Sequence, residues 1–124
     1  MERVLDGIVS DGKKVAGRVL GRYIDQIRAT VRLPSLLPNT LNVNLQFPYR
    51  LRPDFTISRH DWAHHEDVSF EACRVGDVPA VIMRTSTNYH GDHVLEIMAE
   101  VNLREALGVE TGDAVEVTVF APAD

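Results

Sequence analysis

The sequence has little cysteine and little positive charge. Cys73 is the single cysteine among 124 residues, so an internal disulfide is excluded. Lys and Arg number 13 against 18 Asp and Glu, and the formal net charge is −5. A protein whose main function is to bind nucleic acid needs clustered Lys and Arg to neutralise phosphates, so we expect no nucleic-acid partner. A local basic site for one small phosphorylated ligand is still allowed.

Long apolar segments are absent as well. No stretch approaches the roughly 20 apolar residues that a transmembrane helix needs, so we expect no membrane partner. The first residues, Met1-Glu-Arg-Val-Leu-Asp, lack the apolar run of a signal peptide. The sequence therefore predicts a cytoplasmic protein.

The composition is that of a folded domain. Hydrophobic residues make up 44% and charged residues 25% of the chain, which is typical of a globular protein rather than a disordered one. A chain of this length can bury one core and is too short for two ordinary domains. We therefore expect a single domain over residues 1–124.

Alternating apolar and polar residues predict several strands. The clearest is Thr40–Phe47, where the odd-numbered residues are apolar and the even-numbered ones are polar. This pattern is typical of a half-buried strand with one solvated face. Gly76-Asp77 separates two apolar segments and predicts a hairpin turn between them. The other predicted strands are Val4–Val9, Val68–Val75, Pro79–Arg84, His93–Ala99 and Ala114–Phe120.

Two segments have helical patterns. Between Gly17 and Arg32, apolar residues at positions 20, 24, 27 and 31 form one face of an amphipathic helix. A second, short helix begins after Asn102, whose side chain can cap the first free amides, and ends at Gly108. Strands dominate, so the sequence predicts a mainly β fold with two helices, arranged as a small barrel.

Two blocks of the sequence match a known family. The first is Pro38-Asn-Thr-Leu-Asn-Val-Asn-Leu45, and the second runs from Leu95-Glu-Ile-Met-Ala99 through Leu103-Arg-Glu105 to Gly112-Asp-Ala-Val115. In order and spacing, from about Leu5 to Val119, the chain resembles the archaeal-type CTP-dependent riboflavin kinases. The corresponding family motifs are P-G-T-L-N-V-x-L and L-E-I-I-A-P…L-R-E…L-x-x-G-D-x-V.

The resemblance implies a fold, a reaction and a metal site. The family fold is a six-stranded cradle-loop barrel, and its members transfer the γ-phosphoryl group of CTP to the 5′-hydroxyl of riboflavin, giving FMN, with Mg²⁺. It implies that Thr40 and Asn42 are the metal ligands. Two residues apart on a strand, their side chains share a face and offer two oxygens, the ligand type that Mg²⁺ prefers. From the residues alone, an ordinary solvated strand face is the alternative.

The resemblance places the flavin substrate at Glu96. This residue would contact riboflavin and orient or deprotonate the attacking hydroxyl, while an exposed strand glutamate is the alternative. Counting back from Glu96 puts the family's flavin-contacting threonine at Asn88, one residue after Thr87. Either of these two residues could therefore take that role.

The resemblance places the nucleotide against two segments. One is formed by Val101, Asn102, Leu103 and Arg104. Backbone groups at a helix start suit a polar or anionic ligand, and the Arg104 guanidinium could add charge near phosphate. The alternative is a surface arginine in a short helix.

The other nucleotide segment is the first loop, where the sequence departs from the family. The family's glycine-rich turn, S-G-x-G-x-G, corresponds here to a segment that begins at Ser10 and retains only Gly12 and Gly17. Asp11 replaces a glycine and would repel phosphate. Lys13 and Lys14 could hold a triphosphate by charge.

Three neighbouring histidines, His60, His64 and His65, suggest a transition-metal site. Zinc needs three or four ligands in compatible geometry, and His60 and His64 share a face only within a helix. Pro53 and the polar surroundings favour a loop, so metal binding by this cluster stays open.

Two other functions also stay open. The altered first loop is compatible with a non-catalytic flavin- or nucleotide-binding barrel. The Gly112-Asp-Ala-Val115 segment also resembles swapped-hairpin transcription factors of the AbrB type, although the acidic balance disfavours DNA binding. We expect a monomer or a weak homo-oligomer.

Overall fold

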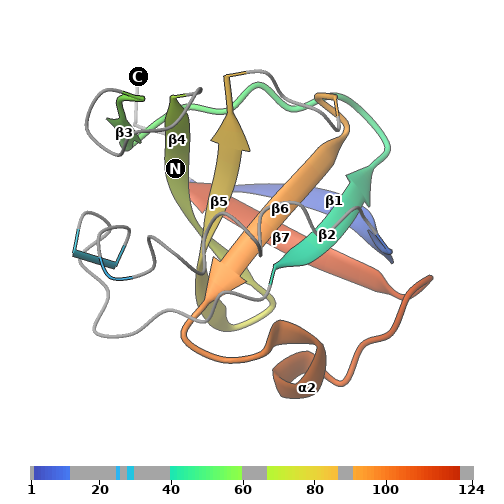
Figure 1. The fold of residues 1–124 in the computed structure, drawn as a ribbon. Helices are drawn as coiled ribbons and strands as arrows, with labels where there is room; N and C mark the ends of the chain where they lie inside the picture. The colour runs from blue at the N-terminus through green and yellow to red at the C-terminus, as the bar shows by residue number, and fades with distance from the viewer. Residues whose placement is uncertain are drawn as a thin grey trace.

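The chain folds around one antiparallel sheet (Figure 1). The computed structural model describes residues 2–11, 25, 28–29, 40–59, 67–86 and 91–120. The elements are β1 (Glu2–Ser10), β2 (Leu41–Leu45), β3 (Phe55–Ile57), β4 (Val68–Val75), β5 (Val78–Thr85), β6 (Val94–Ala99), α2 (Leu103–Leu107) and β7 (Ala114–Phe120).

Six of these strands close into a barrel. Hydrogen-bonded neighbours follow the order β3-β4-β5-β6-β2-β1-β7, and β4 also pairs with β7. The last part of β4 joins β7, whereas its first part pairs with β3, which lies beside the closed barrel. The predicted mainly β fold and six-stranded barrel are confirmed. The sequence-based strand boundaries differ from the observed ones by one or two residues, and β4 and β7 occupy the predicted ranges.

The predicted hairpin between β4 and β5 is also confirmed. Val75 pairs with Val78, so Gly76 and Asp77 form a two-residue loop. Gly76 has a φ of 56°, a left-handed conformation that glycine adopts without steric cost and that tight hairpin turns require.

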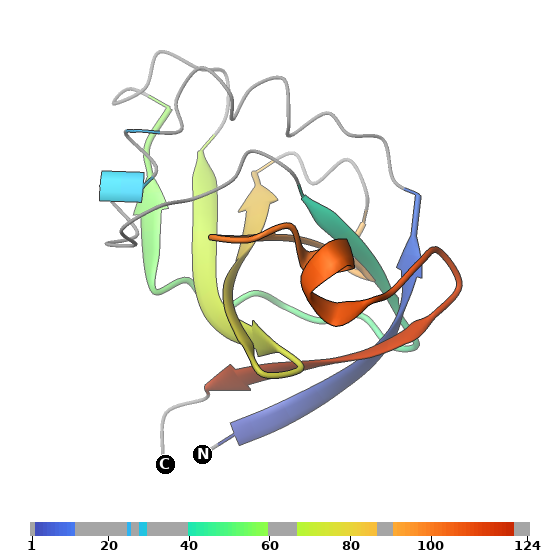
Figure 2. The ribbon, with the colours of Figure 1, turned by 90° about the horizontal axis from the view of Figure 1, so that it is seen from below.

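The barrel interior is aliphatic. Alternate residues of each strand point inward, and Val43, Ile82, Leu95, Ile97 and Val117 have no exposed surface. The side chain of Leu103 joins this core. Figure 2 shows α2 lying across one end of the barrel, so the helix closes that end with an apolar side chain.

Gly7 allows β1 and β2 to approach closely. A Cβ atom at Gly7 would lie 2.3 Å from Cγ1 of Val43 and 2.9 Å from the carbonyl oxygen of Asn44. Because one of these contacts is with backbone, a side chain here would force the two strands apart.

The outer face of the barrel is also buried over part of its area. Val68, Phe70, Val81, Met83 and Met98 alternate with the inward-facing residues of their strands and are 5% exposed or less. The strands β4, β5 and β6 therefore have apolar side chains on both faces. This outer apolar surface lies beside the predicted site residues.

The strand predicted over Thr40–Phe47 needs two corrections. The strand ends at Leu45, so Phe47 leaves the alternation and is 70% exposed instead of buried. The polar face is not solvated throughout, because Asn42 is only 4% exposed.

The short helix α2 begins and ends as predicted. The side chain of Asn102 accepts a hydrogen bond from the backbone N–H of Glu105, and Gly108 ends the helix with a φ of 63°. Of the helix predicted between Gly17 and Arg32, the described residues Asp25, Arg28 and Ala29 are helical, and the others lie outside the described residues. Within the described ranges, no helix is long and apolar enough to cross a membrane.

Candidate functional site

A row of polar residues crosses three strands on the outer face of the barrel. Asn42 of β2 pairs with Ser10 of β1 on one side and with Glu96 of β6 on the other. Directly opposed residues in antiparallel strands have side chains on the same face, with Cβ atoms about 4.5–5.5 Å apart. We call Ser10, Asn42 and Glu96 the polar row. All three are predicted site residues from distant parts of the sequence.

Asn42 has the features of a ligand-binding residue. Its Oδ1 atom is buried and has no hydrogen-bond partner among the described residues, an arrangement that costs about 1–3 kcal/mol. Thr40 is half-buried and directly precedes β2, two residues before Asn42, so a continuation of the strand alternation would direct its side chain to the same face. A hydroxyl and an amide oxygen on one face fit the preference of Mg²⁺ for hard oxygen ligands.

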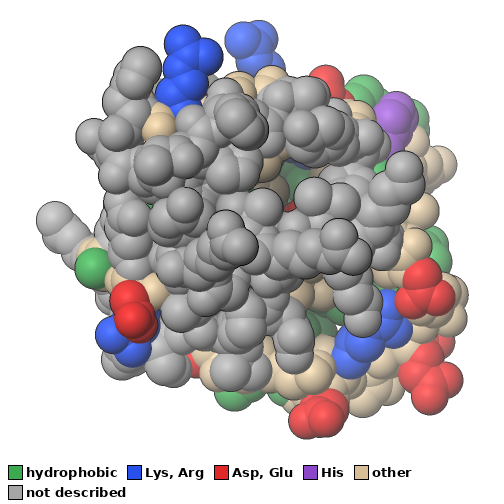
Figure 3. All heavy atoms as spheres, viewed as in Figure 1, with side chains coloured by type: hydrophobic (Ala, Val, Ile, Leu, Met, Phe, Trp, Pro, Cys, Tyr) green, Lys and Arg blue, Asp and Glu red, His purple; other side chains and the backbone are tan. Residues whose placement is uncertain are grey.

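Glu96 is buried against the outer apolar surface. It is 9% exposed, so the alternative of an exposed strand glutamate is wrong. Its neighbour on β5 is Met83, and Met98 follows two residues later on the same face, paired with Val81. In the orientation of Figure 1, Figure 3 shows hydrophobic and acidic side chains in a hollow over β6. The Glu96 carboxylate therefore lies among apolar side chains that are themselves 5% exposed or less.

Arg104 forms hydrogen bonds with residues of its own chain. Its Nη2 atom lies 3.2 Å from Oδ1 of Asp11, 3.2 Å from Oγ1 of Thr111 and 3.4 Å from the carbonyl oxygen of Ser10. The Thr111 hydroxyl donates to the same Asp11 oxygen at 2.8 Å. We call Asp11, Arg104 and Thr111 the Asp11 cluster. No local pattern pairs Asp11 with Thr111, because 100 residues separate them.

Of the remaining predicted nucleotide residues, Asn102 and Leu103 have structural roles in α2, whereas Val101 precedes the helix. Val101 is exposed, the side chain of Asn102 caps the helix, and the side chain of Leu103 packs into the core. A ligand at this segment would therefore meet the Val101 side chain and the backbone of Asn102 and Leu103. The following predicted site residues lie outside the described residues: Gly12, Lys13, Lys14, Gly17, Thr87 and Asn88.

The histidine cluster, His60, His64 and His65, lies outside the described residues too. In the described part of the chain, no group of three or more His, Cys, Asp or Glu side chains is placed to hold a metal ion. Cys73 is buried, and burial raises the pKa of its thiol to about 12. A neutral, buried thiol is unsuited to act as a nucleophile.

Sequence reasoning missed a second buried polar group, which lies inside the barrel. The hydroxyl of Tyr49 donates to both carboxylate oxygens of Glu71, at 2.9 and 2.7 Å, and the backbone N–H of Arg52 donates to Glu71 at 2.7 Å. Both Tyr49 and Glu71 are 4% exposed. Burial, together with the Glu71 carboxylate, raises the pKa of Tyr49 above its ordinary range.

Arg84 forms hydrogen bonds that link the buried pair of Tyr49 and Glu71 to β6. Its Nη1 atom donates to the carbonyl oxygen of Tyr49 at 2.6 Å, and Nη2 donates to the carbonyl oxygen of Val94 at 3.3 Å. Burial lowers the pKa of Arg84, while Asp92 opposes that shift. Because the polar atoms of Glu71 and Tyr49 bond to each other and to backbone, this group serves stability.

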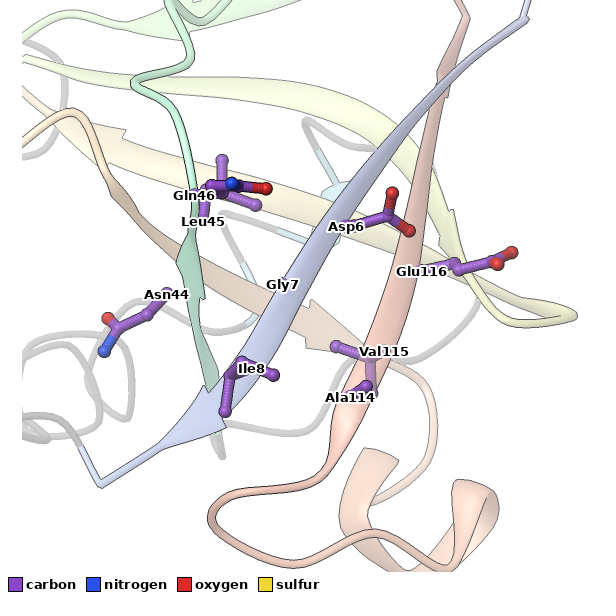
Figure 4. Close-up of a pocket in the computed structure, with 9 residues that line it drawn as sticks. All are labelled: Asp6, Gly7, Ile8, Asn44, Leu45, Gln46, Ala114, Val115 and Glu116. Atoms are coloured by element: carbon purple, nitrogen blue, oxygen red, sulfur yellow. The ribbon is translucent and has the colours of Figure 1, made fainter.

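A groove of about 700 Å³ lies on the outer face of β1, β2 and β7 (Figure 4). Ile8, Asn44 and Ala114 line it, and Asp6 and Glu116 stand directly opposite each other on β1 and β7. Two adjacent carboxylates disfavour a phosphorylated ligand. Thr40, Asn42, Glu96 and Arg104 do not line this groove, so it is separate from the candidate site.

The closed six-stranded antiparallel barrel fits the class of cradle-loop barrels. The profile of the CTP-dep_RFKase family, described as domain of unknown function DUF120, matches residues 11–119. The chain therefore belongs to this family, as its sequence motifs predicted. The family match also disfavours the alternative that the chain is a transcription factor of the AbrB type.

Curated relatives carry the name riboflavin kinase. The protein of Methanocella arvoryzae is 34% identical over 92 residues, which cover 66% of this chain and 40% of the relative. The protein of Pyrobaculum arsenaticum is 33% identical over 95 residues, covering 67% and 44%. The protein of Thermococcus kodakarensis is 32% identical over 94 residues, covering 67% and 43%. The matched part of the chain thus spans less than half the length of these relatives.

Proposed function

We propose that this protein is a CTP-dependent riboflavin kinase. It transfers the γ-phosphoryl group of CTP to the 5′-hydroxyl of riboflavin, so that the products are FMN, CDP and the hydroxyl proton. Family membership and the name shared by the relatives support the reaction. The observation that carries the proposal is the polar row, which brings Ser10, Asn42 and Glu96 together from three strands.

Thr40 and Asn42 are the proposed Mg²⁺ ligands. The buried Asn42 oxygen without a partner among the described residues is the feature that supports this assignment. Bound Mg²⁺ neutralises phosphate charge, and it needs only one or two protein ligands when phosphates and water supply the others.

Glu96 is the residue proposed to bind the 5′-hydroxyl of riboflavin, which accepts the phosphoryl group. It lies next to Asn42 in the pairing of β2 and β6, so a hydroxyl held by Glu96 would stand beside the proposed metal ligands. Burial of the carboxylate excludes water that would compete for the same hydroxyl. The neighbouring side chains of Val81, Met83 and Met98 are apolar, and methionine sulfur packs well against aromatic rings. Thr87 or Asn88 would contact the flavin as well.

The proposed nucleotide site lies at the end of β1. It consists of the first loop, with Ser10, Gly12, Lys13, Lys14 and Gly17, and of the start of α2. There, Val101, Asn102, Leu103 and Arg104 would contact the nucleotide. Phosphoryl transfer depends mainly on positioning and charge neutralisation, and Lys13, Lys14 and Arg104 are the proposed cations. A cytoplasmic location remains a prediction.

The direct test is a product assay with purified protein, riboflavin, Mg²⁺ and each of CTP, ATP, GTP and UTP. We expect FMN and CDP in equal amounts with CTP, and loss of the reaction when EDTA removes Mg²⁺. Adding Mg²⁺ back should restore it. Failure to form FMN with any of the four nucleotides would contradict the kinase assignment.

A second candidate function is a non-catalytic flavin- or nucleotide-binding barrel. The observation that favours it is the ion pair between Asp11 and Arg104, because an acidic residue stands where the family has a glycine. This alternative predicts that riboflavin or CTP binds, as followed by flavin fluorescence or calorimetry, while no FMN forms.

A further inference from the structure

In the Asp11 cluster, hydrogen-bond donors surround an anion. That anion is the carboxylate of Asp11 itself. A guanidinium nitrogen of Arg104 and the hydroxyl of Thr111 both point to one oxygen of Asp11, at 3.2 and 2.8 Å. Charged and neutral donors that converge on one oxygen are the usual means of binding a phosphate or a carboxylate. In Figure 3, basic and acidic side chains lie close together at the lower right, beside the end of β1 and α2.

The carboxylate in this cluster is accessible to exchange. The side chain of Asp11 is 78% exposed and that of Arg104 is 33% exposed. Exposed ion pairs contribute little to stability because water and salt compete with them. A polyanion with several charged oxygens can therefore displace the single carboxylate of Asp11.

Backbone hydrogen bonds fix the cluster relative to the polar row. The N–H of Val9 donates to the carbonyl oxygen of Asp113 at 2.9 Å, and the N–H of Gly112 donates to the carbonyl oxygen of Val9 at 2.8 Å. These bonds join the end of β1 to the turn that carries Thr111. Asp11 directly follows Ser10, which pairs with Asn42, so the cluster lies one residue beyond the row.

We propose that Asp11 is a built-in competitor of the nucleotide phosphates: its carboxylate occupies the anion-binding position formed by Arg104 and Thr111 and lowers the affinity for CTP. This inference rests on the proposed nucleotide site. The phosphate chain must first displace Asp11, and Thr111 then becomes a phosphate-binding residue that the sequence motifs do not indicate. Removing the negative charge of residue 11 weakens its competition with phosphate for both donors.

The test compares Asp11→Asn with the unaltered protein by calorimetric titration with CTP and, separately, with inorganic tripolyphosphate. No riboflavin is present, so binding is measured without turnover. We expect Asp11→Asn to bind both probes about two- to fivefold more tightly, the range set by the strength of an exposed ion pair. Arg104→Gln should weaken binding, and the double variant should show no gain over Arg104→Gln alone.

Glu110→Gln is the matched control, because it removes an exposed negative charge next to Thr111 without touching the ion pair. It should change binding less than Asp11→Asn does. Unchanged or weaker binding by Asp11→Asn overturns the inference, as does an equal gain from Glu110→Gln. Tighter binding of CTP by the double variant than by Arg104→Gln alone also overturns the inference. The effect of Asp11→Asn would then not act through Arg104.

The outcome is separable from that of the kinase assay. If no variant makes FMN but Asp11→Asn gains affinity through Arg104, the inference stands and the catalytic proposal fails. If FMN forms and Asp11→Asn shows no gain, the kinase stands and the inference fails. An absence of tripolyphosphate and CTP binding in all variants overturns the inference as well.

Discussion

Two regions of the barrel bury polar side chains, and the regions differ in whether the buried polar atoms have hydrogen-bond partners. Inside the barrel, Glu71 accepts hydrogen bonds from the Tyr49 hydroxyl and the Arg52 backbone, and all of these partners belong to the protein. On the outer face, Asn42 buries an oxygen that has no partner among the described residues. A satisfied buried polar group stabilises a fold, whereas an unsatisfied one destabilises it. The difference suggests that the first region serves folding and that the second serves a ligand.

The strongest test of this comparison removes the interior carboxylate. Glu71→Ala leaves the buried Tyr49 hydroxyl without its acceptor and removes the partner of the partly buried Arg52 N–H, and we expect the free energy of unfolding to fall by about 4 kcal/mol. Urea unfolding followed by circular dichroism measures it. Tyr49→Phe is a milder variant that keeps the ring and should cost about 2 kcal/mol.

If the interior group serves folding alone, the folded fraction of both variants should keep its rate of FMN formation. A large fall in that rate at full folding would contradict the division between the two regions.

The converse test replaces Asn42. Asn42→Leu removes the proposed metal ligand, and we expect kcat/KM for FMN formation to fall about 100-fold, which corresponds to roughly 2.7 kcal/mol. Stability should stay the same or rise, because a buried oxygen without a partner is lost. Initial rates at several Mg²⁺ concentrations and urea unfolding give both quantities.

Thr118→Val is the matched control for Asn42→Leu, since Thr118 is a buried polar strand residue outside the polar row. It should leave the rate unchanged. If Asn42→Leu lowers stability and activity together, Asn42 is a structural residue like Glu71, and the comparison fails.

Gly7 offers a test that should affect both regions. A methyl group in Gly7→Ala would collide with Val43 in the core and with the backbone of Asn44, so we expect a loss of about 2 kcal/mol of stability. Displacing β1 from β2 also separates Ser10 from Asn42, so activity should fall as well. Ile8→Ala, at the next and exposed position, should change thermal stability by less than about 1 kcal/mol.

The smallest expected effect concerns alkaline stability. Burial raises the pKa of Cys73 from its ordinary 9.0 to about 12. Between these two pH values the unfolded chain releases the thiol proton and the folded chain keeps it, so stability falls as pH rises. Cys73→Ala should flatten the decline of the unfolding free energy over this range. Equal slopes for the two proteins would show that Cys73 does not contribute.

Much of the fold was predictable from local patterns. Alternation located β4 and β7 at their observed ranges, Gly76-Asp77 located the hairpin, and Asn102 and Gly108 located the ends of α2. Each signal depends on residues a few positions apart, where backbone geometry links sequence directly to structure. Alternation failed at Phe47, because the end of a strand is set by its partner strands and not by its own sequence.

The candidate site was predictable as a set of residues and not as an arrangement. Family motifs singled out Thr40, Asn42 and Glu96, but the burial of Asn42 and Glu96 came as a correction to a solvated strand face. The buried group of Tyr49 and Glu71 had no motif. Tyr49 lies 22 residues before Glu71, so no local pattern indicated that the two side chains would meet inside the barrel.

The sequence by itself determined the kind of elements, their approximate bounds, the family and the side chains available for chemistry, because these depend on local periodicity and on residue type. Only the tertiary structure decided which of those side chains meet. The pairing of β1, β2 and β6 placed Ser10, Asn42 and Glu96 in one row, and barrel closure brought Asp11 to Arg104. Contacts between residues tens of positions apart follow from strand register and closure, which no local pattern contains.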